Sequence, residues 1–384
     1  MTPRERMNAA MRPRDGCLPD RVPVMCQLSL GHYFLHAGLN AADVWHDTAA
    51  FGEALLTLQR RYGFDGILVN LPGRDPRWRD ALAGTVRHGP DQVLIWRTGT
   101  ETVVPPDDNP RVRRADGRAI GTPAVAEVSP DRCFYVEPHG QFGAVMIEEG
   151  GFPVWQFETI RYVRERAPEI SVHGEVFSPF SQWLEWVGHT EALVALVEHP
   201  EKVQACLGRL ADGAVALGLG QAAAGIDALL ISSAFAGAGL ISRRQYRAFV
   251  LPFERAVVDG LRRARPGLPI YTHTCGVIGD RLDLIEATGT DGIDTLDPPP
   301  LGTVDLVDAK RRLGGRLFIK GNLDPVGTLL RGSAEACFAA ARDRLAAAKA
   351  GGGYVLSTAC SVAPHTRPGN VLQLRRAVEE EGWY

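Results

Sequence analysis

Short apolar runs alternate with amphipathic segments through most of this chain, and this alternation constrains the fold more than any other feature. Strand-like runs occupy residues 21–28, 65–71, 170–174, 226–232, 269–273, 291–296, 316–322 and 354–357. Helical patterns separate these runs after residue 150, for example at 199–223, 242–264 and 333–350. Strands that alternate with helices pair in parallel through right-handed crossovers. Eight such units predict an α/β fold of the (β/α)₈ TIM barrel type.

An open, doubly wound sheet is the alternative architecture for the same pattern. Sheets of that kind that bind dinucleotides carry a glycine-rich turn after the first strand. No such turn follows residues 21–28, and the pair Gly237 and Gly239 has no strand–turn–helix context. These observations favour the closed barrel.

Residues 73–150 interrupt the alternation with proline and glycine turns and short alternating pieces such as 92–97 and 101–104. A connection of this length is too long for a simple loop in a compact domain. We therefore expect an N-terminal excursion of short antiparallel strands and loops, inserted as a lid into a single barrel domain that spans 1–384. A helix is expected at 41–62, before this excursion.

Composition excludes several classes of partner. Apolar residues make up 45% of the chain, charged residues 23%, and the net charge is −3, so nothing predicts a nucleic-acid partner. No apolar run approaches the length of a membrane span, and the first residues do not resemble a secretory signal. Seven scattered cysteines, an odd number, are typical of free thiols in a reducing compartment. A cytoplasmic protein without a membrane partner is the expectation.

One imidazole and one thiol stand two residues apart at the end of the run 269–273. His273 and Cys275 would point to the same face of an extended strand. Cys360 follows the last predicted strand, and in a closed barrel all strand ends share one mouth. One histidine and two cysteines can bind Zn²⁺ and leave a fourth position open, as in catalytic zinc sites.

A carboxylate could occupy the fourth position at rest. Glu175 is our choice because it follows the strand-like run 170–174, and His173 is a less favoured alternative. The simpler interpretation is a buried thiol beside a hydrogen-bonded core histidine, because a single His-X-Cys pattern is weak on its own. We interpret the other five cysteines as structural: Cys17, Cys26, Cys133, Cys206 and Cys337.

The second half of the chain resembles the uroporphyrinogen decarboxylase superfamily. The resemblance is carried by HTCG at 273–276, GTDGID at 289–294, KGNLDP at 320–325 and GGYVLSTACSVAPHT at 352–366. It extends over about 160–380, and the first 150 residues fit poorly. The His-X-Cys motif with a distant Cys resembles the pattern that is characteristic of the zinc-dependent methyltransferase branch. That branch includes methylcobamide:coenzyme M methyltransferases and corrinoid-linked demethylases of methoxylated compounds.

This resemblance implies a methyltransferase that uses Zn²⁺ and a cobalamin held on a partner corrinoid protein. The chain itself lacks the Asp-X-His-X-X-Gly pattern of a cobalamin-binding module. Asn322 and Asp297, at two other strand ends, would line the substrate pocket, although each could equally shape a turn. A methoxylated compound could donate the methyl group, or a thiol could accept it. The sequence does not determine the direction of transfer.

Two further hypotheses follow from the same residues. The decarboxylases of this superfamily carry an arginine-rich segment after the first strand, whereas residues 26–33 here read CQLSLGHY. That difference disfavours the first alternative, a metal-free decarboxylase that acts on a tetrapyrrole. The second alternative is a barrel that binds a corrinoid or a metabolite without catalysis.

Overall fold

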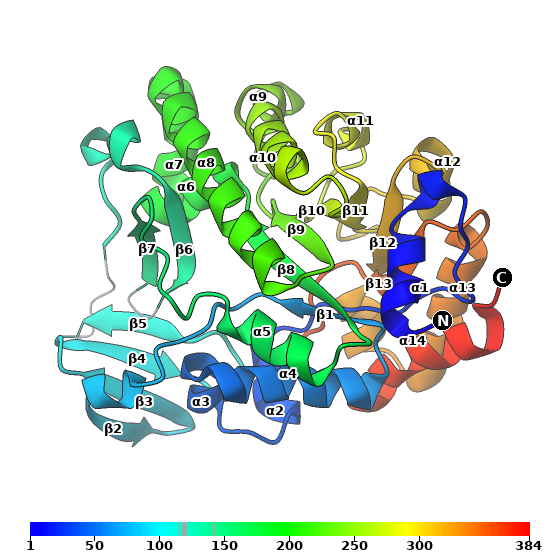
Figure 1. Ribbon diagram of the computed structural model, residues 1–384, viewed down its shortest axis with the longest axis horizontal. Helices are drawn as coiled ribbons and strands as arrows, with labels where there is room; N and C mark the ends of the chain where they lie inside the picture. The colour runs from blue at the N-terminus through cyan, green and yellow to red at the C-terminus, as the bar shows by residue number, and fades with distance from the viewer. Residues whose placement is uncertain (115, 117–120, 141–142) are drawn as a thin grey trace.

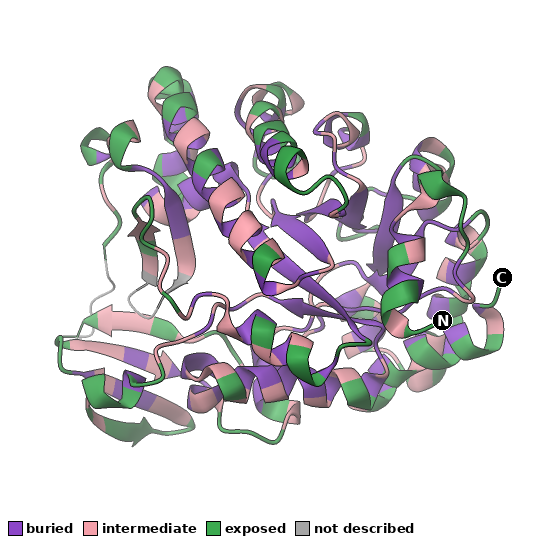
Figure 2. Ribbon diagram, in the orientation of Figure 1, coloured by how far each residue is buried: buried purple, intermediate pink, exposed green. Residues whose placement is uncertain are grey.

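The computed structural model describes residues 1–114, 116, 121–140 and 143–384. Its centre is a curled parallel sheet (Figure 1), which has seven strands. The strands follow one another in the order β1-β8-β9-β10-β11-β12-β13, each parallel to its neighbours. Figure 2 shows that these strands are buried almost throughout. Their bounds are β1 Gly66–Val69, β8 Ser171–Phe177, β9 Ala228–Ser232, β10 Ile270–Thr274, β11 Gly292–Thr295, β12 Phe318–Leu323 and β13 Tyr354–Thr358.

The predicted first strand is wrong as a regular strand, although its residues occupy the expected place. Residues 22–28 lie between β13 and β1 and make only isolated bridges, such as Val24 to Leu356. The nitrogen of Met25 donates to Leu356 O (3.1 Å), and the nitrogen of Asp65 donates to Val24 O (2.7 Å). Pro23 has no N–H, and the Asp65 carboxylate takes the N–H of Val24, so a continuous ladder cannot form. This segment still closes the barrel, which confirms the predicted fold class.

Helices cover the outside of the sheet between successive strands. After β8 and β9 these are α6 Pro179–Val187, α7 His189–Glu198, α8 Pro200–Ala224, α9 Arg243–Phe249 and α10 Leu251–Ala264. The remaining ones are α5 Glu158–Arg166, α11 Leu282–Glu286, α12 Leu306–Leu313, helical turns at Pro325–Leu330, α13 Ala334–Ala348 and α14 Pro368–Glu381. Among the described residues, none of the helices combines the length and apolarity needed to cross a bilayer.

Two helices that we predicted as continuous are each broken once. Residues 41–62 form α3 Ala41–His46 and α4 Thr48–Tyr62, because the Asp47 side chain caps the nitrogens of Ala49 and Ala50 and starts a new helix. Residues 242–264 break at Val250, just before Pro252, which lacks the N–H that a helix interior needs. Ser242 is the N-cap of α9, and Gln245 completes a capping box with it.

The expected excursion contains two small antiparallel sheets. One has four strands: β2 Leu82–His88, β3 Asp91–Trp96, β4 Thr100–Val104 and β5 Arg111–Arg114. The other is a hairpin of β6 Tyr135–Gly140 and β7 Gly143–Ile147. The hairpin packs on α6 and α8, where Gly213 of α8 leaves room for the carbonyl of Phe134. The hairpin thus attaches this part of the excursion to the barrel wall through α6 and α8.

The first helix closes the bottom of the barrel. Helix α1 (Pro3–Ala10) begins with a capping box of Thr2 and Glu5 and presents Met7 to the interior. Met7, Ala10 and Met11 belong to a separate apolar cluster inside the barrel, together with Met25, Leu68, Ala228, Leu230, Tyr271, Phe318 and Val355. Apolar side chains thus fill the end of the barrel that α1 covers. A site is therefore expected at the opposite mouth, where the carboxyl ends of the strands carry polar residues.

Candidate metal centre

Strand β10 delivers two of the predicted ligands from one rigid element. All five residues of β10 are buried, and Tyr271 faces the barrel interior, so His273 faces the same way two residues later. His273 Nε2 lies 3.2 Å from Cys275 Sγ. The imidazole and the first thiol are therefore adjacent, as the spacing predicts.

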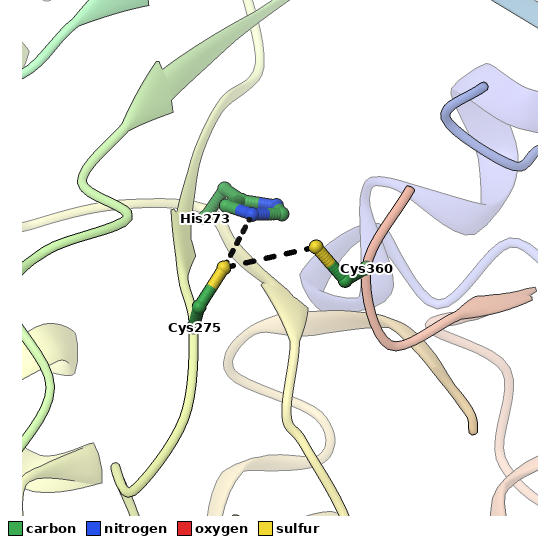
Figure 3. A group of neighbouring side chains, drawn as sticks. All are labelled: His273, Cys275 and Cys360. Carbon is green, nitrogen blue, oxygen red and sulfur yellow. Dashed lines mark hydrogen bonds between the residues drawn. The ribbon is translucent and has the colours of Figure 1, made fainter. Parts of the chain in front are cut away.

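Cys360 reaches the same point from the loop after β13. Its Sγ lies 3.8 Å from Cys275 Sγ, and the ligand atoms of His273, Cys275 and Cys360 all lie within 4.8 Å of one another (Figure 3). A tetrahedral zinc with bonds of about 2.3 Å would hold two sulfurs about 3.8 Å apart. The sulfur pair already has this spacing. Within the described part of the chain, no other group of three such residues meets the same distance limit.

A buried charge network orients His273. Its Nδ1 lies 2.8 Å from Thr295 Oγ1 and 3.3 Å from Asp294 Oδ2. Lys320 Nζ lies 2.9 and 3.0 Å from the two oxygens of Asp294. Parallel register places His273, Asp294 and Lys320 side by side on β10, β11 and β12. A carboxylate at Nδ1 keeps the proton on that nitrogen and leaves Nε2 free to bind a metal.

The electrostatics of the three residues suit a cation. Burial alone would lower the pKa of His273, yet hydrogen bonds to Asp294 and Cys360 outweigh burial and raise it. The hydrogen bond from Cys275 lowers the pKa of Cys360, and the neighbouring His273 lowers it further. The same hydrogen bond stabilises the protonated form of Cys275 and thus raises the pKa of that thiol. The surroundings therefore favour a positive charge beside a thiolate, which is what a bound divalent cation supplies.

The structure does not bring Glu175 into this three-residue group. Glu175 is on β8, and β9 separates that strand from β10. Its carboxyl hydrogen-bonds Ser232 of β9, while burial raises its pKa to about 7. The alternative, His173, is fully buried with Nδ1 at 2.8 Å from Tyr271 Oη and Nε2 at 3.1 Å from Ser171 Oγ. Both nitrogens of His173 thus have protein partners.

Asn322 lies near the end of β12, and Asp297 lies two residues beyond the end of the neighbouring β11. Asn322 Nδ2 donates to Leu296 O at 2.8 Å, and its Oδ1 is a buried atom without a hydrogen-bond partner. Asp297 Oδ2 accepts from the nitrogen of Gly276 at 2.5 Å. Burial raises the pKa of Asp297 to about 6, against the lowering effect of that hydrogen bond. Asp297 is thereby fixed next to the loop that follows Cys275.

The chain turns sharply between β11 and Asp297. Thr295 and Leu296 both have positive φ, at 84° and 55°, although neither is glycine. Such conformations are uncommon for branched side chains and concentrate at functional sites. Here they let Thr295 bond His273 while Asp297 bonds Gly276.

Sequence reasoning missed the residues that support the ligands. Asp294 and Lys320 belong to the segments GTDGID and KGNLDP, but the contact of Asp294 with His273 and that of Lys320 with Asp294 become visible only through strand register. An inward-facing Asp and Lys on the two strands after His273 were the available signal. His32 and His36 were missed as well, although both contact the loop that carries Cys360.

Comparison with known proteins gives one family match and several relatives. The uroporphyrinogen decarboxylase (URO-D) family model matches residues 147–381. Uroporphyrinogen decarboxylase of Serratia proteamaculans is 27% identical over 274 residues, 69% of this chain and 72% of that protein. The Shewanella loihica protein of the same name is 32% identical over 183 residues, 47% of this chain and 49% of its own length. The chain thus matches between about half and about three quarters of these two relatives.

A solved structure shares the whole fold. The "methyltransferase from Methanosarcina mazei" aligns over 99% of this chain and 99% of its own, with a TM-score of 0.69 and 18% sequence identity. The likeness includes the first 146 residues, which the family model leaves unmatched. The excursion is therefore part of a fold that at least one other protein shares.

Proposed function

This chain belongs to the uroporphyrinogen decarboxylase family of enzymes, and from that premise we propose that it is a zinc-dependent methyltransferase. It would move a methyl group between a small methylated, or methoxylated, substrate or a thiol and a corrinoid carried by a partner protein in the cytoplasm. The observation that carries this proposal is the meeting of His273, Cys275 and Cys360 at one point. The Methanosarcina mazei protein is itself called a methyltransferase, which agrees with this reaction class, but the ligand set is the basis of the proposal.

The three residues would hold zinc and leave room for one more donor. The sulfur spacing of 3.8 Å suits a tetrahedral ion, whereas the His273 Nε2–Cys275 Sγ distance of 3.2 Å would open by a few tenths of an ångström, to about 3.6 Å. Two thiolates and a neutral imidazole give a site with a net charge of about zero around Zn²⁺. Glu175 is our candidate for the fourth position at rest.

Zinc bound there would act as a Lewis acid that stabilises negative charge. It would keep a thiol deprotonated or stabilise the oxygen that leaves a methyl ether. The chain's own residues do the remaining work. Asp294 and Thr295 hold the proton on Nδ1 of His273, and Lys320 balances the charge of Asp294. Asn322 and Asp297 would contact the substrate from the two neighbouring strand ends.

Metal analysis combined with a methyl-transfer assay tests the proposal. The purified protein should contain about one zinc per chain, and Cys360→Ala should lose most of it because a three-ligand site becomes a two-ligand site. Cys337→Ala is the matched control, because Cys337 is a buried thiol of α13 that bonds Thr328 O. Methylated donors and thiol acceptors would then be screened through the absorption of cobalamin. Wild-type protein without zinc, or with no change in the cobalamin spectrum for any donor or acceptor, would refute it.

Uroporphyrinogen decarboxylation is a second candidate, favoured by the names of the sequence relatives. The absence of arginine from residues 26–33 opposes it, because a substrate with several carboxylates needs cationic partners. Acidic groups near the ligands, namely Glu175 and Asp297, oppose it as well. Turnover of uroporphyrinogen by metal-free protein would favour this candidate over methyl transfer.

A further inference from the structure

Cys360 is held differently from the other two ligands. It lies two residues beyond the end of β13, on the loop that leads to α14. Near the base of this loop, the nitrogen of Val362 donates to Gln27 O (2.9 Å), and the nitrogen of Ser29 donates to Val362 O (3.2 Å). The part beyond Val362 rests on α2 (Leu30–His36), a helix that the family model does not match.

Two histidines of α2 contact this loop through its backbone. His32 is fully buried, and its Nδ1 lies 3.1 Å from Ala363 O and 3.2 Å from Pro364 O. Carbonyl oxygens only accept, so Nδ1 must carry the proton. Tyr62 Oη, 2.7 Å from Nε2, then donates to the second nitrogen. His36 Nε2 lies 3.1 Å from Pro364 O and donates to the same peptide.

Helix α2, residue 107 of the excursion and the Cys360 loop pack closely together at Gly31. A Cβ at this position would lie 2.1 Å from Asp107 O and 2.8 Å from Pro364 Cγ, so only glycine fits. The two imidazoles lie against each other, with ring centroids 4.4 Å apart. The loop is therefore fixed by contacts from the N-terminal part of the chain as well as by β13.

We propose that His32 and His36 are positioning residues that set the place of Cys360 relative to Cys275. Their N–H groups hold the carbonyls of residues 363 and 364, three and four positions after the thiol, in an otherwise irregular loop. Removal of these donors frees the loop and lets Cys360 leave the other two ligands. The inference rests on the proposed metal site, and it assigns a role to the segment where the decarboxylases were expected to carry arginines.

The test compares substitutions that keep or remove the N–H donor. Asparagine places its amide nitrogen close to the position of Nδ1, and glutamine places its own close to Nε2. His32→Asn and His36→Gln should therefore keep the loop in place, whereas His32→Leu and His36→Leu should release it. Leu35→Ala is the control on the same helix, because the Leu35 side chain is 38% exposed.

Cobalt substitution reports the ligands directly. In the two leucine variants, affinity for Co²⁺ should fall about tenfold, as for other residues that support metal ligands. The thiolate-to-cobalt absorption per bound ion should fall by about half, because one of two thiolates is lost. The Asn, Gln and Leu35→Ala proteins should resemble wild type. Leucine variants with wild-type affinity and spectrum would overturn the proposal.

A measurement without metal separates this inference from the proposed function. A dibromobimane reagent bridges two neighbouring thiols, and peptide mapping would identify the Cys275–Cys360 product. Bridging should be strong in wild type and in the rescue variants but weak in both leucine variants. If wild type binds neither zinc nor cobalt, the proposed function fails, and the bridging result still decides whether the histidines place Cys360. Since His36 is only partly buried, His36→Leu remains informative even if His32→Leu unfolds.

Discussion

Two regions hold the three candidate ligands, and they do so by opposite physical means. His273 and Cys275 lie on or next to β10, and a buried ion pair of Asp294 and Lys320 stands behind the imidazole. Cys360 lies on a loop that is held by neutral imidazoles and backbone carbonyls. The first support uses charge inside the barrel, whereas the second uses hydrogen bonds between segments far apart in the sequence.

This difference separates stability from ligand placement. A buried ion pair offsets a large desolvation cost, so the loss of one partner leaves an uncompensated charge and destabilises the whole barrel. Neutral hydrogen bonds contribute about 1 kcal/mol each, so their loss mainly frees the loop. Changes behind His273 should therefore lower the stability of the whole protein, and changes behind Cys360 should disturb the site with little loss of stability.

The largest effect is expected for Lys320→Met. Both side chains of the Asp294–Lys320 pair are 3% exposed, so the variant would leave a buried carboxylate without its lysine partner. The free energy of unfolding should fall by about 3–5 kcal/mol, as for other broken buried pairs. Urea denaturation followed by circular dichroism measures this change.

Two further variants control for the loss of the lysine itself. Lys320→Met combined with Asp294→Leu removes both charges and should recover much of the lost stability. Lys202→Met removes a partly exposed lysine whose ammonium bonds Ala126 O, and it should change stability by less than about 0.5 kcal/mol. If the single Lys320 variant were as stable as wild type, the charged support behind His273 would be unimportant for folding.

A smaller, pH-dependent effect is expected at the neutral support. Burial, with His36 and Arg61 nearby, lowers the pKa of His32 from 6.5 to about 4, against the raising effect of the carbonyls of residues 363 and 364. The unfolded chain therefore takes up a proton at a higher pH than the folded chain. This contribution to stability is complete above pH 6.5 and is lost as the pH falls toward 4, by about 3 kcal/mol in total.

His32→Asn isolates this contribution because it keeps the donor and removes the titration. Unfolding free energies of both proteins would be measured at several values between pH 7 and pH 4. Wild type should lose more stability than the variant over this interval, and the gap should approach about 3 kcal/mol. Parallel pH curves for the two proteins would mean that His32 does not remain neutral in the folded state.

The barrel and the meeting of the three candidate ligands could be predicted because their signals are local or periodic. Seven of the eight predicted strands are regular, and the positions of His273, Cys275 and Cys360 at strand ends follow from alternation and barrel closure. The eighth, at 21–28, fails because Pro23 and the Asp65 carboxylate remove two ladder donors, and only the second requires knowledge of the fold.

The supports could not be predicted because they depend on contacts between distant residues. His32 and Ala363 are 331 positions apart, and no periodicity links them. Similarly, residues 41–62 could form one continuous helix or two helices. The chain breaks at Asp47 because its side chain caps the start of α4. The predicted barrel does not by itself give the register of β10, β11 and β12, and that register is what places Asp294 beside His273 and Lys320 beside Asp294.

The smallest effect is expected where the excursion meets the Cys360 loop. His365 Nε2 lies 2.7 Å from Asp107 Oδ2, and these side chains are 67% and 40% exposed. Exposed ion pairs contribute about 0–1 kcal/mol, so Asp107→Asn should barely change the free energy of unfolding. Zinc affinity should remain within about twofold of wild type, because the imidazoles of His32 and His36 already hold the loop.

Asp108→Asn, on the next residue, is the matched control because its carboxylate lies outside this ion pair. Equal zinc affinities for the two variants would exclude the Asp107–His365 ion pair from the support of Cys360. A tenfold loss for Asp107→Asn but not for Asp108→Asn would instead extend that support to the excursion. The position of the loop that carries Cys360 would then depend on contacts made with residues 105–110. The support of Cys360 would in that case include an exposed ion pair, whereas the ion pair behind His273 is buried.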